Sequence, residues 1–110
     1  MADQHSLFDE SLKATGSDGE RDLRSVALMS REVYLLLKYG YPFSEQEQAL
    51  RASKAVRGIH RVRIGAYWIE LMLGDLARSA REISSRRLLD ELDELYSVLE
   101  HAVAHGRETL

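Results

Sequence analysis

The stretch ASKAVRGIHRVRIGAYWIELMLGDLARSAREI, residues 52–83, contains the most regular apolar pattern in this chain of 110 residues. Its apolar residues return every seven positions and stop at Gln48 on one side and at Arg87 on the other. The repeating core positions are Ala52/Ala55, Ile59/Val62, Ala66/Ile69, Leu73/Leu76 and Ala80/Ile83. Such a repeat is typical of a long helix packed against other helices. The stretch therefore predicts the central helix of an all-α protein.

The expected central helix is too long for a compact monomer. If it runs unbroken from about residue 45 to residue 83, its length is about 58 Å at roughly 1.5 Å per residue, whereas a compact domain of this size has a diameter of about 35 Å. Between residues 63 and 81 it is also apolar around most of its circumference. We therefore expect a homodimer that covers the overhang, with a kink at Gly58, Gly65 or Gly74 as the alternative. The dimer core candidates are Ile59, Val62, Ala66, Ile69, Leu73 and Leu76.

A further helix is expected on each side of the central one. Ser17 with Glu20 has the capping-box pattern that opens a helix, and Gly40 suits the left-handed position just past its end. The last helix is expected to begin at Ser84-Ser85 and to end at Gly106, with an apolar seam of Leu88, Leu92, Leu95, Leu99 and Ala102. The predicted fold class is therefore all-α, with three main helices in a bundle that homodimerisation completes.

Length and composition predict a single domain. Residues 1–16 are expected to be a flexible N-terminal tail, residues 17–106 one helical domain, and residues 107–110 a frayed C-terminus. The absence of cysteine excludes disulfides and thiolate metal sites. Neither a secretory signal nor a membrane-spanning run is apparent, so we expect a cytoplasmic protein that does not associate with membranes.

Charge is distributed unevenly along the chain. Residues 51–87 contain nine Lys/Arg against three Asp/Glu, whereas residues 88–110 contain one against six. The basic stretch either pairs with its acidic neighbours, forms a solvated face, or binds an acidic protein or a nucleic acid. The candidates for an anion-binding stripe are Arg51, Lys54, Arg57, Arg61 and Arg63. Doubled in a dimer they can bind phosphates, although no short helix–turn–helix pair with a recognisable recognition helix is apparent.

No catalytic, cofactor or metal motif is apparent. His101 and His105 are spaced to share a helix face, but a zinc site needs three or four ligands, and both residues suit the C-terminal turn of a helix. Glu70 is the only acid in a long apolar run, and an ion pair with Arg63 or Arg78 is its expected role. We predict that the protein is not an enzyme and holds no cofactor or metal.

The segments Arg51–Arg57 (RASKAVR) and Ile64–Leu73 (IGAYWIELML) suggest a family resemblance. With its length, its lack of cysteine and its expected helical plan, the chain resembles the small bacterial anti-activators that bind a LuxR-type quorum-sensing transcription regulator and stop it dimerising or reaching DNA. The resemblance is one of size and architecture, so no functional residue is carried over. It implies a dimer that sequesters another protein through an apolar surface.

The expected function is therefore a non-catalytic, regulatory protein–protein interaction that sequesters a partner such as a transcription regulator. One alternative is a basic-faced dimer that binds DNA or RNA, and another is a structural subunit or a secretion chaperone. Large apolar side chains near the predicted helix connection and on the central helix are the candidate partner contacts: Tyr34, Leu37, Tyr39, Tyr41, Phe43, Trp68 and Met72.

Overall fold

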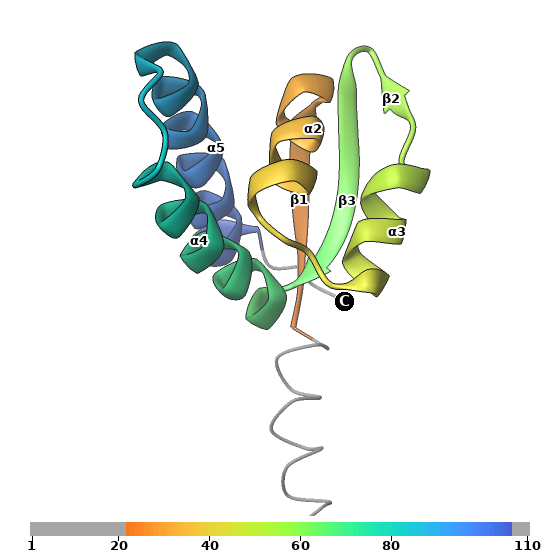
Figure 1. Ribbon diagram of the computed structural model, residues 1–110. Coiled ribbons are helices and arrows are strands. Elements are labelled where there is room, and N and C mark those ends of the chain that lie inside the picture. The colour runs from red at the N-terminus through yellow and green to blue at the C-terminus, as the bar shows by residue number, and fades with distance from the viewer. Residues whose placement is uncertain (1–21, 107–110) are drawn as a thin grey trace, which may run out of the picture.

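The computed structural model describes residues 22–106 and contains a sheet as well as helices, so the all-α prediction is wrong. Of these residues, 64% are helical and 19% are in strands, which makes the fold mixed α/β. Along the chain the elements are β1 (Leu23–Met29), α2 (Ser30–Tyr39), α3 (Ser44–Ala52), β2 (Ala55–Val56), β3 (Ile59–Gly65), α4 (Ala66–Ala80) and α5 (Arg86–His105) (Figure 1).

Three predictions concern residues outside this range. The flexible tail at residues 1–16, the capping box of Ser17 and Glu20, and the frayed end at residues 107–110 all lie outside the described residues.

The strands form an antiparallel sheet in the order β1-β3-β2. β1 and β3 pair along their whole length, from Leu23 opposite Gly65 to Met29 opposite Ile59. β2 adds only a short edge through its two residues. Alternate side chains of β1 and β3 face the core, as a half-buried strand requires. The inward-facing, buried residues are Val26, Leu28, Val62 and Ile64.

The predicted central helix is divided into α3, a β-hairpin and α4. Ile59 and Val62 fit a helical repeat, but β-branched residues also favour strands. Arg57 and Gly58 form the turn, with φ values of 55° and 81°. Two successive left-handed residues are typical of the tightest hairpin turns. The chain therefore reverses where a continuous helix was expected.

The first predicted helix is also partly a strand. Residues 23–29 form β1, and α2 begins only at Ser30, where the Met29 N–H donates to a Glu32 carboxylate oxygen at 2.8 Å. The helix ends at Tyr39, close to where Gly40 predicted its end. Gly40 itself is not left-handed, because its φ is −92°.

The last helix agrees with the sequence pattern. The Ser85 side chain caps α5 by accepting a hydrogen bond from the Leu88 N–H at 3.2 Å, and the helix ends before Gly106. Four residues of the predicted seam are buried, namely Leu92, Leu95, Leu99 and Ala102. Within residues 22–106, no helix combines the length and the apolar character needed to cross a membrane.

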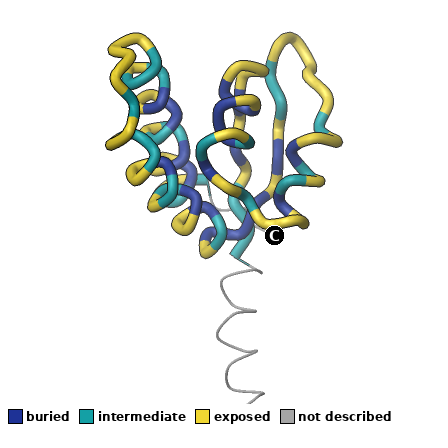
Figure 2. The backbone as a smooth tube through the Cα atoms, in the orientation of Figure 1, coloured by how far each residue is buried: buried dark blue, intermediate teal, exposed yellow. Residues whose placement is uncertain are grey.

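The core lies between the sheet, α2 and the α4–α5 pair. In Figure 1, α2 lies across β1 and β3, while α4 and α5 run antiparallel at the side of the sheet away from the hairpin. Figure 2 shows that the buried positions of these elements face one another. The most completely buried large side chains are Val26, Leu28, Leu35, Leu36, Leu50, Ile64, Ile69, Leu76, Leu95 and Leu99.

Polar contacts attach the end of α5 to the edge of β1. The Ser25 N–H donates to the Gly106 carbonyl oxygen at 2.9 Å. The largely buried guanidinium of Arg24 donates to the Val103 carbonyl oxygen and to Asp22, the latter at 2.8 Å. Because the Arg24 guanidinium is largely buried, its charged hydrogen bonds fix the end of α5 against the edge of β1.

Candidate nucleic-acid interface

The predicted anion-binding stripe is distributed around the hairpin and the adjoining end of α3. All of its members are exposed, and the sequence contains no acid between Gln48 and Ile69. Arg51 is in the last turn of α3, Lys54 precedes β2, Arg57 is at the hairpin tip, and Arg61 and Arg63 are on β3. Arg51, Lys54 and Arg57 thus lie at the hairpin end of the fold, Arg61 lies along β3, and Arg63 lies toward the other end of β3, beside the first turn of α3.

The basic side chains lie on both sides of the sheet. Arg61 pairs with Ala27 and Arg63 with Ser25, and this row of residues is exposed on the open face of the sheet. Arg51 belongs to α3, which packs against β3 from the other face. The hairpin end therefore presents positive charge in two directions.

The turn at the hairpin tip has a backbone conformation that favours glycine or asparagine. Arg57 has a φ of 55°, and a left-handed conformation costs a residue with a Cβ atom about 1 kcal/mol. Asn-Gly is the usual sequence for such a turn. An exposed arginine therefore occupies a position where it lowers the stability of the fold.

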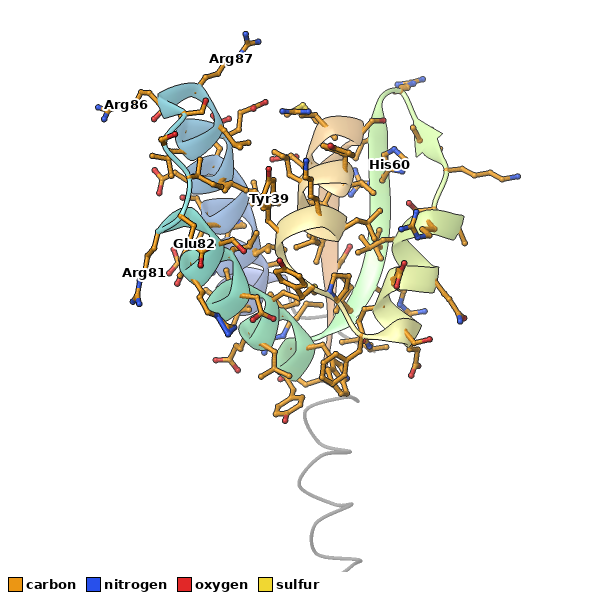
Figure 3. All side chains as sticks on the ribbon, in the orientation of Figure 1. Tyr39, His60, Arg81, Glu82, Arg86 and Arg87 are labelled. Atoms are coloured by element: carbon orange, nitrogen blue, oxygen red, sulfur yellow. The ribbon has the colours of Figure 1, made fainter. Side chains whose placement is uncertain are left out.

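His60 connects the hairpin to both neighbouring helices. Its Nδ1 lies 2.9 Å from the Ser53 hydroxyl, and its Nε2 lies 2.9 Å from the Ser30 hydroxyl. Because the Ser53 hydroxyl donates to the Leu50 carbonyl oxygen at 2.7 Å, it accepts from Nδ1–H. The ring fixes β3 against the start of α2 and the end of α3 (Figure 3).

The open face of the sheet is apolar at the end next to the hairpin turn. Met29 is 51% exposed and Val56 is 71% exposed. Met29 of β1 and Val56 of β2 both pair with Ile59 of β3, one on each side of it. This apolar row lies beside Arg61 and Arg63 on the same face. The face therefore offers cations next to a patch suited to the sugar and methyl groups of a nucleic acid.

The candidates for a dimer core lie mainly inside one chain. Val62, Ala66, Ile69 and Leu76 are buried, and Leu73 packs against them. Ile59 is partly exposed at the open sheet face. The four buried side chains therefore pack within one chain, whereas Ile59 and Leu73 keep part of their surface exposed.

The candidate partner contacts do not form one surface, because some are buried in the core and others are exposed on different elements. Met72 is in the core, whereas Leu37 and Tyr39 are partly buried against it. Tyr34 is exposed on α2 and has the Lys38 ammonium over its ring. Tyr41 is also exposed, in the connection between α2 and α3.

Two of these candidates meet in an aromatic cluster that also includes a residue absent from the prediction. The Phe43 and Trp68 rings lie 4.9 Å apart, and the Tyr67 ring lies 5.0 Å from that of Trp68. Phe43 and Tyr67 are exposed. Tyr67 is absent from the predicted contacts because, on the expected central helix, it would share the narrow polar face with Arg63 and Glu70.

The paired histidines and Glu70 do not belong to a recognisable metal or catalytic site in the described part of the chain. The rings of His101 and His105 are 4.8 Å apart and exposed, but residues 22–106 contain no group of three metal-ligating side chains. Glu70 is exposed on α4.

Comparison with known proteins identifies no relative: no protein-family model matches the chain, and neither a curated protein nor a solved structure is significantly similar to it.

The contacts of His60 could not be anticipated from the sequence, because Ser30 and Ser53 approach it only after the sheet has formed. The turn left only a weak local signal. Arg57-Gly58 stands between β-branched residues, but only its glycine matches the Asn-Gly, Asp-Gly or Gly-Gly pairs that indicate a two-residue hairpin loop.

Proposed function

We propose that the protein binds double-stranded DNA through the hairpin and the C-terminal turn of α3. The observation that carries this proposal is the exposure of five basic residues on the hairpin, along β3 and at the end of α3, in a stretch that lacks acids: Arg51, Lys54, Arg57, Arg61 and Arg63. A two-stranded ribbon fits the major groove of B-form DNA. The groove has phosphates on both walls, and the hairpin has cations on both sides.

The arrangement of helices supports the same proposal. α2 and α3 are consecutive short helices joined by residues 40–43, a connection typical of helix–turn–helix pairs. The order strand, helix, helix, hairpin, with the last strand between the other two, resembles that of winged helix–turn–helix domains. This is a likeness of topology, which by itself does not define a function.

The charges of α3 indicate which part of it faces the DNA. Gln48 and Arg51 are exposed in its second half, and these residue types recognise adenine and guanine edges. Arg51 Nε donates to a Glu47 carboxylate oxygen at 2.9 Å, so DNA would have to replace this exposed ion pair. Glu45 and Glu47 lie in its first turn, where they would repel phosphates. The contact therefore includes the C-terminal end of α3 and the hairpin. RNA is a poorer target, because the major groove of its A-form duplex is too narrow for side chains to read.

The proposal is tested by fluorescence anisotropy with a duplex of about 20 base pairs at several salt concentrations. Five phosphate contacts predict a slope of about −4 to −5 for log K against log salt. The double variant R57A/R61A should make the slope less negative by about 2. The control R81A/R87A removes the same charge from two exposed arginines at the α4–α5 connection, on the other side of the molecule (Figure 3), and should leave the slope unchanged. Absence of binding at about 50 mM salt, or equal losses in both variants, would overturn the proposal.

A regulatory protein-binding role is a second proposal, favoured by the exposed aromatic residues. Phe43, Tyr67 and Trp68 form a cluster at one end of the molecule, and aromatic residues are enriched in protein interfaces. The long apolar helix on which this role depends is divided into α3, a hairpin and α4, so the support for this role is weaker than that for DNA binding. In both roles the protein is expected to be non-catalytic. Whether it dimerises is a separate question that sedimentation equilibrium can test.

A further inference from the structure

The helix pair α4–α5 has a groove on its surface, far from the basic hairpin. The groove has a volume of about 460 Å³ and lies between the second half of α4 and the first half of α5. Leu76 and Leu92 form its buried floor, and Ala77 and Ala80 form a low wall on α4. Small residues in that wall allow another backbone to approach closely. The groove is therefore shaped for an elongated apolar segment.

The α5 wall of the groove is acidic. Asp90 and Asp93 line it and are exposed. α5 contains no Lys or Arg after Arg87, while it contains five acids after that residue. Arg86 reaches Asp90 only at 4.0 Å, and both side chains are largely solvated, so this ion pair neutralises little. Figure 3 shows Arg86 pointing outward from the start of α5.

Charge selects among the possible occupants. A second copy docked groove to groove would bring the acidic α5 walls of the two copies together, and like charges in an interface are unfavourable. Residues 1–21 of this chain contain five Asp/Glu against two Lys/Arg, so their charge also disfavours this site. The basic hairpin is on the opposite side of the molecule (Figure 1). A basic partner from another protein fits the charge best.

We propose that the α4–α5 groove binds a basic amphipathic helix of a partner protein. The α5 lining extends from Arg86 to Tyr96, which corresponds to about 15 Å or three helical turns. A helix of that length presents apolar residues at i, i+3, i+4 and i+7 to a groove. Its lysines or arginines would flank Asp90 and Asp93. This proposal does not depend on DNA binding, because none of the groove residues belongs to the hairpin.

The test uses a helical peptide of about 18 residues that contains only leucine and lysine, with leucine on one face. Its titration into the labelled protein is followed by fluorescence anisotropy, and the contact residues are mapped by amide chemical-shift changes. We expect the shifts to centre on Ala77, Ala80, Leu89 and Asp93. The same peptide with glutamate in place of lysine should not bind.

Two variants and one control locate the site. Asp93→Lys reverses a charge on the rim, and Ala77→Trp fills the groove from an exposed position. Each variant should lower the affinity for the peptide by about tenfold or more. Glu100→Lys makes the same charge change at an exposed α5 residue outside the groove lining, and should change affinity by less than about twofold. Equal effects of Asp93→Lys and Glu100→Lys, full binding by Ala77→Trp, or no binding of the basic peptide would overturn the proposal.

Discussion

At the scale of single residues, two exposed side chains occupy backbone conformations that glycine would adopt at lower cost. Arg57 has a φ of 55° at the hairpin tip, and Tyr41 has a φ of 47° after α2. Each conformation costs about 1–2 kcal/mol for a residue with a Cβ atom. Local backbone strain of this kind often accompanies function. At Arg57 the proposed function supplies a reason, since the tip is where a cation reaches furthest into a groove.

Arg57→Asn should raise stability while weakening DNA binding. Asparagine tolerates the left-handed conformation, so we expect the free energy of unfolding to rise by about 1 kcal/mol. Loss of the guanidinium should lower DNA affinity by about fivefold or more. Urea unfolding and anisotropy measure the two effects on the same sample. A variant that is more stable and binds DNA as well as the original protein would remove Arg57 from the interface.

At the scale of elements, α5 is attached to the rest of the fold mainly by its apolar seam. Leu95 and Leu99 have no exposed surface and face the core shared with α4, β1 and α2. The seam was recognisable in the sequence because α5 has a clear cap, a clear end and one apolar stripe.

Leu99→Ala should therefore cost about 2–5 kcal/mol of the free energy of unfolding, because it leaves a cavity in the core. Leu71→Ala is the matched control, since Leu71 is exposed on α4, and it should cost less than about 1 kcal/mol. Both values are obtained from urea denaturation. Similar costs at the two positions would mean that α5 does not pack as described.

An ion pair also joins α5 to α2, and it makes part of the stability depend on pH. Arg31 holds Glu91 through two hydrogen bonds of 3.0 Å, and these bonds, together with its charge, lower the pKa of Glu91 below its ordinary value of 4.5. A carboxylate with a lowered pKa in the folded state stabilises the fold above its unfolded pKa. That contribution is lost as the pH falls through the folded pKa.

Glu91→Gln should lower the urea midpoint at about pH 7 and lower it by less at about pH 3, because the contribution of the Glu91 charge decreases once the pH is below the unfolded pKa. Glu94→Gln, at an exposed α5 position, serves as the control and should have little effect at either pH. An equal decrease for Glu91→Gln at both pH values would show that the charge of Glu91 does not contribute.

At the scale of the whole molecule, opposite charges are located on opposite sides. The hairpin end is basic, whereas the exposed face of α5 is acidic (Figure 1). The two proposed ligands, a DNA duplex and a basic helix, would therefore bind surfaces that share no residue. Such an arrangement allows the protein to hold both at once.

The two surfaces should behave independently. Ala77→Trp should leave DNA affinity unchanged within about twofold, and R57A/R61A should leave the affinity for the leucine–lysine peptide unchanged within the same limit. The triple variant should show the sum of the separate free-energy changes, because distant sites are usually additive. Both affinities are measured by anisotropy on each variant. A large departure from additivity would show that the surfaces are coupled.

The sequence alone determined the features that depend on local patterns. It predicted α5 with its cap, seam and end, the end of α2, and the concentration of basic residues between Arg51 and Arg63. Each of these follows from residues close together in the chain, which interact whatever the rest of the fold does. The candidate DNA-binding residues were therefore identifiable even though their arrangement was not.

Only the tertiary structure decided that residues 23–29 and 59–65 are strands. In both segments the apolar residues fit a helical repeat as well as an alternating one, so local pattern did not distinguish the two. A strand satisfies its backbone hydrogen bonds only through another strand, and β1 and β3 are separated by two helices in the chain. Their pairing creates the open face that carries Arg61 and Arg63, buries Val62 on the other face, and places His60 beside Ser30. These outcomes depend on contacts between distant segments, which no local pattern specifies.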